Sequence, residues 1–262
     1  GALAEYFGAI EGASLEANKG AYSYAWMIIF AVIAAIMVLI GLYHIRMLPS
    51  NQIPSTTKKT TSEVGRELVA VIANFFTKKH IFYYICFIIL YRLAEGFIMK
   101  IAPLFLRASR EVGGLGLSLK EIGTLNGVFG SAAFVLGSLL AGIYVSKFGL
   151  KRTLFTLCCI FNLPFLAYTF LAVTQPTNVY LIGTCITMEY FGYGFGFVGL
   201  TLFMMQQIAP GKHQMSHYAF ASGIMNLGVM LPGMVSGYFS DLLGYRNFFI
   251  YVLIATIPAF LI

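Results

Sequence analysis

Long apolar runs separated by short polar stretches divide this chain into segments of membrane-spanning length. A helix needs about 20 apolar residues to cross roughly 30 Å of hydrocarbon. Six runs meet that length, at residues 21–45, 79–106, 120–145, 153–174, 178–208 and 215–240. A seventh begins near residue 247 and stops at Ile262, too soon for a full crossing. Lone strands cannot satisfy their backbone groups in lipid, so the pattern predicts an all-α membrane protein.

The polar stretches divide these runs into four parts. Residues 1–20 form a polar, acidic loop, 21–45 a first span, 46–78 a long connection and 79–262 a block of six spans with tight turns. Within the connection, apolar residues recur on one helical face, which predicts an amphipathic surface helix; they are Val64, Leu68, Val71, Ile72 and Phe75. Because Gly1 is not an initiator methionine and the last run is short, we expect a longer natural protein.

Charge supports this reading and sets the orientation. Only 10% of the residues are charged and 59% are hydrophobic, whereas soluble domains carry roughly 25% charged residues. If the spans alternate, ten Lys and Arg fall on the face of the 46–78 connection and five on the other. Positive loops favour the cytoplasm, so we expect 46–78 to be cytoplasmic and 1–20 extracytoplasmic. The net charge of +7 is therefore a topology signal, and we expect no nucleic-acid partner.

A glycine pattern occurs twice in the six-span block, 95 residues apart. Its first copy contains Gly142, Ser146, Lys147, Gly149, Lys151 and Arg152, and its second contains Gly237, Asp241, Gly244 and Arg246. Each copy joins the second and third span of a three-span group, 79–174 or 178–262. Groups of three spans have opposite orientations, which is the inverted repeat of many secondary transporters. We expect both turns to act as gates that hold the cytoplasmic and outer closed states.

Few charges fall inside the predicted spans. A charge there costs roughly 2.5–3.5 kcal/mol and usually faces an interior path. Arg92 and Glu95 are three residues apart and share a helix face, with Lys100 further along the same span. Either Arg92 and Glu95 neutralise each other, or Arg92 binds an anionic carboxylate of a solute while Glu95 tunes it. Lys100 either contacts the solute or extends to the outer surface.

Glu189 has no cation within one turn of its own helix. A desolvated carboxyl holds a proton and releases it when wetted, as a proton-coupling site requires. The alternatives are a neutral acid hydrogen-bonded to a neighbouring helix, or a pair with Arg92 or Lys100.

Uncharged polar and aromatic residues add to the predicted solute path. Tyr193 lies in a run that alternates aromatic residues with glycine, 190–197. On a helix its face suits close packing, flexing or sugar stacking. Asn126 and Asn226 lie on the second span of each group, where they bind solute or hydrogen-bond across helices.

Other chemistries lack a residue pattern. The four cysteines fall inside predicted spans without metal-ligand spacing. His213 and His217 are four apart at a span end, which favours an interfacial position over a metal pair. There is no phosphate-binding loop and no catalytic triad set at membrane depth. We therefore expect no metal, no cofactor, no ATP-driven pump and no enzyme.

This arrangement resembles the major facilitator superfamily, whose members have two six-helix halves joined by a basic cytoplasmic loop. The resemblance implies that 21–45 is helix six, that 46–78 is the inter-half loop and that 79–262 holds helices seven to twelve. The N-terminal six-helix half would then be a partner, helices seven and ten would line the cavity, and nine and twelve would face lipid. The segment 142–152 resembles the family's loop signature, except that Ser146 replaces its aspartate.

Three segments resemble the AmpG-type muropeptide permeases and the related acetyl-coenzyme A transporters: 91–97, 110–118 and 236–246. That resemblance implies proton-coupled import of an anhydro-muropeptide or related amino sugar by alternating access, in a bacterial inner membrane. The competing interpretations are a carrier of another small organic solute, an intramembrane enzyme, and a receptor that transports nothing.

Overall fold

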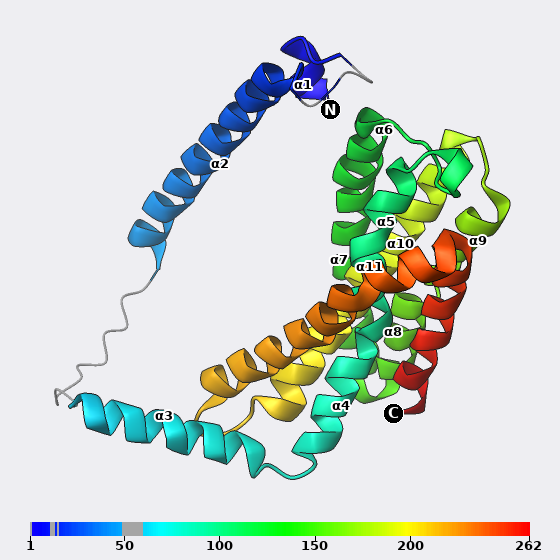
Figure 1. The fold of residues 1–262 in the computed structure, drawn as a ribbon. Helices are drawn as coiled ribbons and strands as arrows, with labels where there is room; N and C mark the ends of the chain where they lie inside the picture. The colour runs from blue at the N-terminus through cyan, green and yellow to red at the C-terminus, as the bar shows by residue number, and fades with distance from the viewer. Residues whose placement is uncertain (1, 11–13, 15, 49–59) are drawn as a thin grey trace. The chain divides into compact units, whose positions relative to one another are not determined.

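The computed structural model describes residues 2–10, 14, 16–48 and 60–262, and the chain divides into two compact units, Gly1–Thr61 and Ser62–Ile262. Every regular element of the described residues is helical (Figure 1), which confirms the all-α fold class.

The first unit consists of a short helix packed on the start of a long one. Helix α1 spans Ala2–Tyr6 and α2 spans Lys19–Met47. The 29 residues of α2 extend for about 44 Å, and the predicted span 21–45 lies within it. The Asn18 side chain accepts a hydrogen bond from the Ile10 amide (2.9 Å) and donates one to the Ile10 carbonyl (2.7 Å). The predicted loop 1–20 therefore contains a helix and folds onto the start of α2.

The second unit contains the surface helix and the six-span block. Its elements are α3 (Thr61–Phe76), α4 (Ile81–Tyr91), α5 (Leu93–Arg107), η1 (Arg110–Val112), α6 (Leu119–Thr124), η2 (Leu125–Gly130), α7 (Ser131–Phe148), α8 (Leu150–Asn162), α9 (Phe165–Thr174), α10 (Val179–Phe203), η3 (Met204–Ile208) and α11 (Gln214–Leu261). η1 is a 3-10 helix, and η2 and η3 are π-helical turns.

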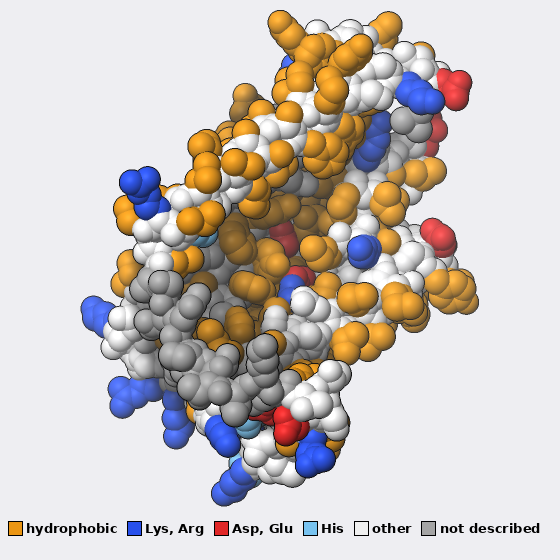
Figure 2. Space-filling view, turned by 90° about the vertical axis from the view of Figure 1, so that its left-hand side faces the viewer, with side chains coloured by type: hydrophobic (Ala, Val, Ile, Leu, Met, Phe, Trp, Pro, Cys, Tyr) orange, Lys and Arg blue, Asp and Glu red, His pale blue; other side chains and the backbone are white. Residues whose placement is uncertain are grey.

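Helical stretches of membrane-spanning length and hydropathy recur along the described residues. They are Lys19–Met47, Ile81–Arg107, Leu119–Phe148, Leu150–Thr174 and Gln214–Leu261, the last long enough for two crossings. Helix α10 has the length, at 25 residues, but its glycines, tyrosines and Glu189 lower its hydropathy. Many large apolar side chains of the described helices are exposed, as a lipid-embedded surface requires, and Figure 2 shows such side chains in orange.

The repeated glycine pattern produces the same backbone turn twice. Gly149, between α7 and α8, has φ 80° and ψ 145°, and Gly244, within α11, has φ 69° and ψ 161°. This region of backbone space is essentially restricted to glycine. The turn at Gly244 folds α11 back on itself, and Figure 1 shows the bend between its orange and red parts. The two copies therefore match in conformation as well as in sequence.

Helix pairing follows the inverted repeat. Helix α5, in the first span of the first group, packs on α11, whose first part is the second span of the other group. Reciprocally, α10 packs on α7. Glycines permit both contacts: a Cβ added at Gly96 would lie 2.6 Å from the Val229 carbonyl oxygen, and one at Gly137 would overlap the Phe191 carbonyl. Close backbone approach through small residues is the usual means of helix association in lipid.

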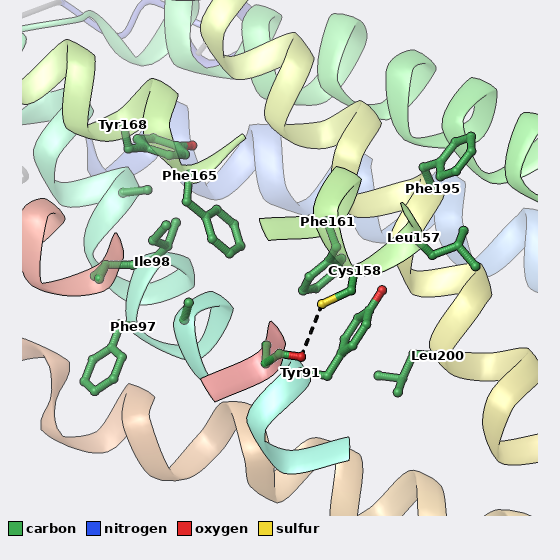
Figure 3. Close-up of a cluster of buried hydrophobic side chains, with 14 of the residues drawn as sticks. Tyr91, Phe97, Ile98, Leu157, Cys158, Phe161, Phe165, Tyr168, Phe195 and Leu200 are labelled. Carbon is green, nitrogen blue, oxygen red and sulfur yellow. Dashed lines mark hydrogen bonds between the residues drawn. The ribbon is translucent and has the colours of Figure 1, made fainter. Parts of the chain in front are cut away.

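An aromatic cluster joins the two groups in the core (Figure 3). Tyr91 is fully buried, its ring centroid is 4.8 Å from that of Phe161, and its hydroxyl donates to the Gly196 carbonyl (3.0 Å). The Cys158 thiol donates to the Ala259 carbonyl at 3.5 Å. The buried cysteine is thus a packing residue, joining α8 to the end of α11.

The surface helix α3 is anchored to the start of α11. Phe75 is buried, with its ring 5.7 Å from the rings of both His217 and Phe220. Of the predicted apolar face, only Val71 and Phe75 are buried in the unit, whereas Val64, Leu68 and Ile72 are exposed. His217 is buried, because its ring lies against α3 with Nε2 3.4 Å from the Val71 carbonyl oxygen.

Lys78 adds a polar anchor just after α3. Its ammonium donates to the carbonyls of Ile208 and Pro210, the latter at 2.9 Å. These carbonyls end the α10–η3 helix and lack helical partners of their own. Burial lowers the pKa of Lys78. The connection is therefore fixed to the same end of the bundle as the start of α11.

Candidate functional site

The first span of the block is interrupted at Arg92. This residue has non-helical φ −104° and ψ 5°, and it ends α4 and precedes α5. Glu95 consequently lies in the first turn of α5, where the free amides and the helix dipole favour a carboxylate. Interrupted helices of this kind form binding sites in many transporters.

Arg92 and Glu95 form a buried bidentate ion pair. Arg92 Nε lies 2.6 Å from Glu95 Oε2, and Nη2 lies 2.5 Å from Oε1. Both residues are only 5% exposed. The guanidinium carbon is also 5.4 Å from the ring centroid of Phe197 on α10, within range of a cation–π contact. Arg92 and Glu95, which the sequence spacing places on one helix face, are therefore paired with each other in the structure.

A cavity of about 110 Å³ lies beside this pair, between α5, η2, α9 and α10. Its polar lining consists of Glu95, Asn126, Tyr168, Glu189, Tyr190 and Tyr193, and the remainder is apolar side chains of α5. Four predicted path residues, Glu95, Asn126, Glu189 and Tyr193, thus meet here from three elements.

Glu189 faces this cavity without a cationic partner. Among the described residues it makes no ion pair, neither with Arg92, which is held by Glu95, nor with Lys100. It shares the cavity with the second carboxylate, Glu95. Glu189 is thus the one cavity carboxylate whose charge no described side chain neutralises.

Asn126 lies within the π-helical turn η2. Its Oδ1 is buried and receives no hydrogen bond from the described residues. Single π turns inside α-helices occur frequently at functional sites. Asn126 is also one of the residues that line the cavity.

Lys100 and Asn226 lie outside the cavity lining. Both are exposed, and the Lys100 side chain runs over Gly233, with Cγ 3.4 Å from the position of an added Cβ. Neither residue contacts Glu189 or Asn126 among the described contacts.

The face of α10 around Tyr193 packs closely against α8. Added Cβ atoms at Gly192 and Gly196 would overlap Ile160 and Phe161 of α8, so these glycines permit close helix packing. The Tyr193 ring, 5.2 Å from that of Phe134, borders the cavity. The glycines are therefore structural, while the tyrosine is available to the site.

Sequence reasoning missed two tyrosines of the cavity. Tyr190 follows Glu189 directly in the sequence, and this neighbourhood of a charge inside a span was the signal that could have identified it. Tyr168 lies on α9, in the span that the family resemblance assigns to the lipid face. It is only 4% exposed and stacks on Phe249 with centroids 5.5 Å apart. Nothing in the pattern of α9 indicated that Tyr168 turns inward.

The residues of the two glycine turns lie at the surface. Gly142 is half-buried, and the other members are exposed: Ser146, Lys147, Gly149, Lys151, Arg152, Gly237, Asp241, Gly244 and Arg246. The Lys147 ammonium is 5.5 Å from the ring centroid of Phe148. The turns are thus accessible to a contacting surface.

Comparison with known proteins decides the family. A sequence model of the Major Facilitator Superfamily matches residues 1–208. The chain belongs to this superfamily. This superfamily member is an integral, multi-pass membrane protein.

Its relatives include named permeases. It is 23% identical over 209 residues to the anhydromuropeptide permease of Escherichia coli K12, covering 80% of this chain and 41% of that protein. It is 25% identical over 238 residues to the putative transporter AmpG 1 of Rickettsia bellii, covering 89% and 56%. The putative transporter AmpG 2 of Rickettsia prowazekii is 27% identical over 194 residues, covering 72% and 44%. The chain thus spans about half the length of the curated relatives it matches.

Proposed function

We propose that the protein is a proton-coupled secondary transporter that moves a polar, amino-sugar-containing solute of the anhydromuropeptide type by alternating access. The observation that carries this proposal is the cavity in which unpaired Glu189 lies beside the Arg92–Glu95 pair. The name of the Escherichia coli relative supports the solute class.

Glu189 is the proposed coupling acid. Inside a closed, water-poor cavity its carboxyl is stable only with a proton, because no described cation offsets its charge. When the cavity opens to water on the far side, the carboxylate is solvated and the proton leaves. Binding and release of the proton thus accompany the change of access.

The Arg92–Glu95 pair is the proposed solute contact. Nε and Nη2 of Arg92 both donate to Glu95, so Nη1 takes no part in the bidentate contact. An anionic carboxylate of the solute would share this guanidinium with Glu95, and Tyr193 would stack on a sugar ring. Lys100 and Asn226, both exposed, would contact the outer parts of a larger solute.

The two glycine turns are the proposed gates. They share an unusual backbone and expose Lys147, Asp241 and Arg246 for contact with the other half of the transporter. We propose that this half is an N-terminal six-helix bundle, joined through residues 46–78 in a bacterial inner membrane. Single cysteines at Ser146 and Asp241 should change in reactivity when solute is added, and unchanged reactivity at both would contradict gating.

Uptake tests the proposal. The protein in its full natural length is placed in right-side-out vesicles with labelled N-acetylglucosamine-anhydro-muramyl peptide and an inward proton gradient. We expect gradient-dependent uptake that Glu189→Gln abolishes and Glu95→Gln reduces. The matched control is Glu111→Gln, a change at an exposed loop carboxylate away from the cavity. A folded wild type without uptake would refute the solute class, and full coupled uptake by Glu189→Gln would refute the coupling role.

A further inference from the structure

Helix α3 keeps a row of apolar side chains uncovered after it has packed on the bundle. Val71 and Phe75 are buried against the start of α11. Beside them lies an exposed apolar sector, whose four residues are 41–67% exposed: Leu68, Val69, Ile72 and Phe76. At about 100° per residue, this sector is centred roughly 90° around the helix from the buried pair. The protein contacts of α3 therefore leave most of its large apolar side chains unused.

The remaining side of α3 is polar or small, and it is exposed as well. Its residues are Ser62, Glu63, Arg66, Glu67, Ala70, Ala73 and Asn74. Water suits such a surface, whereas a contiguous apolar patch with a polar rim marks contact with a membrane or another apolar surface. The circumference of α3 thus divides into three parts: one packed on protein, one suited to water, and the exposed apolar sector.

The position of α3 puts this sector beside the membrane. Its 16 residues rise about 24 Å, less than the roughly 30 Å of hydrocarbon, so α3 does not cross. A short turn joins it to α4, which begins a segment of spanning length, Ile81–Arg107. His80 in this turn has a left-handed backbone with φ 62°, and Figure 1 shows α3 running sideways from the end of the bundle, at a steep angle to α4. The helix therefore lies across the end of the bundle where this span begins.

Exposed apolar residues continue from α3 into the start of α4. Phe82 and Tyr83, in the first turn of α4, are 70% and 53% exposed. Aromatic residues at the ends of spans are enriched at the level of the lipid headgroups. Lys79 is exposed between the two helices, and a cation at this level is attracted to anionic headgroups. These neighbours favour lipid over water or protein as the cover of the exposed apolar sector.

We propose that the exposed apolar sector of α3 inserts into the interface of the bilayer in which the protein is embedded. The polar side of α3 then faces water, and the helix axis follows the membrane surface, as in other interfacial amphipathic helices. Phe75 holds α3 to the start of α11, and Lys78 holds the following turn to the end of η3. The lipid contact therefore fixes the depth of these helix ends in the membrane. The inference does not depend on the proposed transport.

Spin labels that report their surroundings test the proposal. The protein of full natural length, with its native cysteines replaced, carries one nitroxide-labelled cysteine at a time in vesicles of phosphatidylcholine and phosphatidylglycerol. Collisions of the label are measured with oxygen, which concentrates in lipid, and with a nickel chelate, which stays in water. We expect a several-fold higher oxygen-to-nickel collision ratio at Leu68→Cys and Ile72→Cys than at the matched controls Ala70→Cys and Ala73→Cys on the polar side.

Two results would overturn the proposal. Free access of the nickel chelate to all four labels would place the exposed apolar sector in water, and exclusion of both reagents from Leu68→Cys and Ile72→Cys would place protein over it. Both results leave the proposed transport standing. If the cysteine-free protein does not fold, tryptophan introduced at the same four sites of the native protein decides the matter, because brominated phosphatidylcholine quenches the added fluorescence only where the side chain contacts lipid.

Discussion

Replacing Gly149 or Gly244 with alanine should destabilise the protein through the backbone alone. Both residues have positive φ with extended ψ, a region that costs a residue bearing a Cβ about 1–3 kcal/mol. A Cβ added at either position meets no atom within 4 Å, so a steric clash contributes nothing. Because the two turns have the same geometry, we expect the two substitutions to cost about the same.

The glycines that begin each pattern are the matched controls. Gly142 and Gly237 also have open space around an added Cβ, but they lie in helices with ordinary φ. Alanine there should be neutral or stabilise by about 0.5–1 kcal/mol, since glycine is a poor helix former. The four variants thus add the same methyl group, but we expect the free energy of unfolding to fall at Gly149 and Gly244 and to stay or rise at Gly142 and Gly237.

Thermal unfolding of the purified protein in detergent measures the effect. For a unit of about 200 residues, 1 kcal/mol corresponds to about 2–4 °C in Tm. We expect Gly149→Ala and Gly244→Ala to lower Tm by about 2–12 °C and Gly142→Ala and Gly237→Ala to leave it unchanged or raise it. A fall of the same size in all four variants would refute the backbone argument.

Three further substitutions test the packing. Arg92→Met leaves the Glu95 carboxylate buried without its partner and should lower the free energy of unfolding by about 3–5 kcal/mol. Replacing both residues, Arg92→Met with Glu95→Leu, should recover much of that loss. Equal Tm values for the single and double variants in thermal unfolding would contradict this expectation. Gly137→Val should separate α7 from α10, because its side chain would overlap the Phe191 carbonyl, and loss of a cooperative melt is the expected readout; a wild-type melt would show that this contact is not tight. Lys78→Met should cost about 1–3 kcal/mol by leaving two carbonyls without their donor; an unchanged unfolding midpoint in denaturant would show that water replaces the ammonium.

The sequence by itself determined the features that depend on local chemistry. Apolar runs of spanning length can only be helices in lipid, and the structure has helices in those ranges. The repeated pattern predicted two equivalent turns, and Gly149 and Gly244 indeed share a backbone conformation that other residues avoid. The spacing of Arg92 and Glu95 allowed their ion pair, since three residues bring side chains to one helix face.

Only the tertiary structure decided which polar residues meet. Glu95, Asn126 and Glu189 come from separate helices and share a cavity, whereas Lys100 and Asn226, equally polar by sequence, do not line it. Tyr168 turns inward from a span with no marked polar face. The physical reason is that lipid and protein interior are both apolar, so hydrophobicity does not show which face of a membrane helix is inward. The rotation of each helix is set by close contacts at small residues such as Gly96 and Gly137, and these depend on the neighbouring helix.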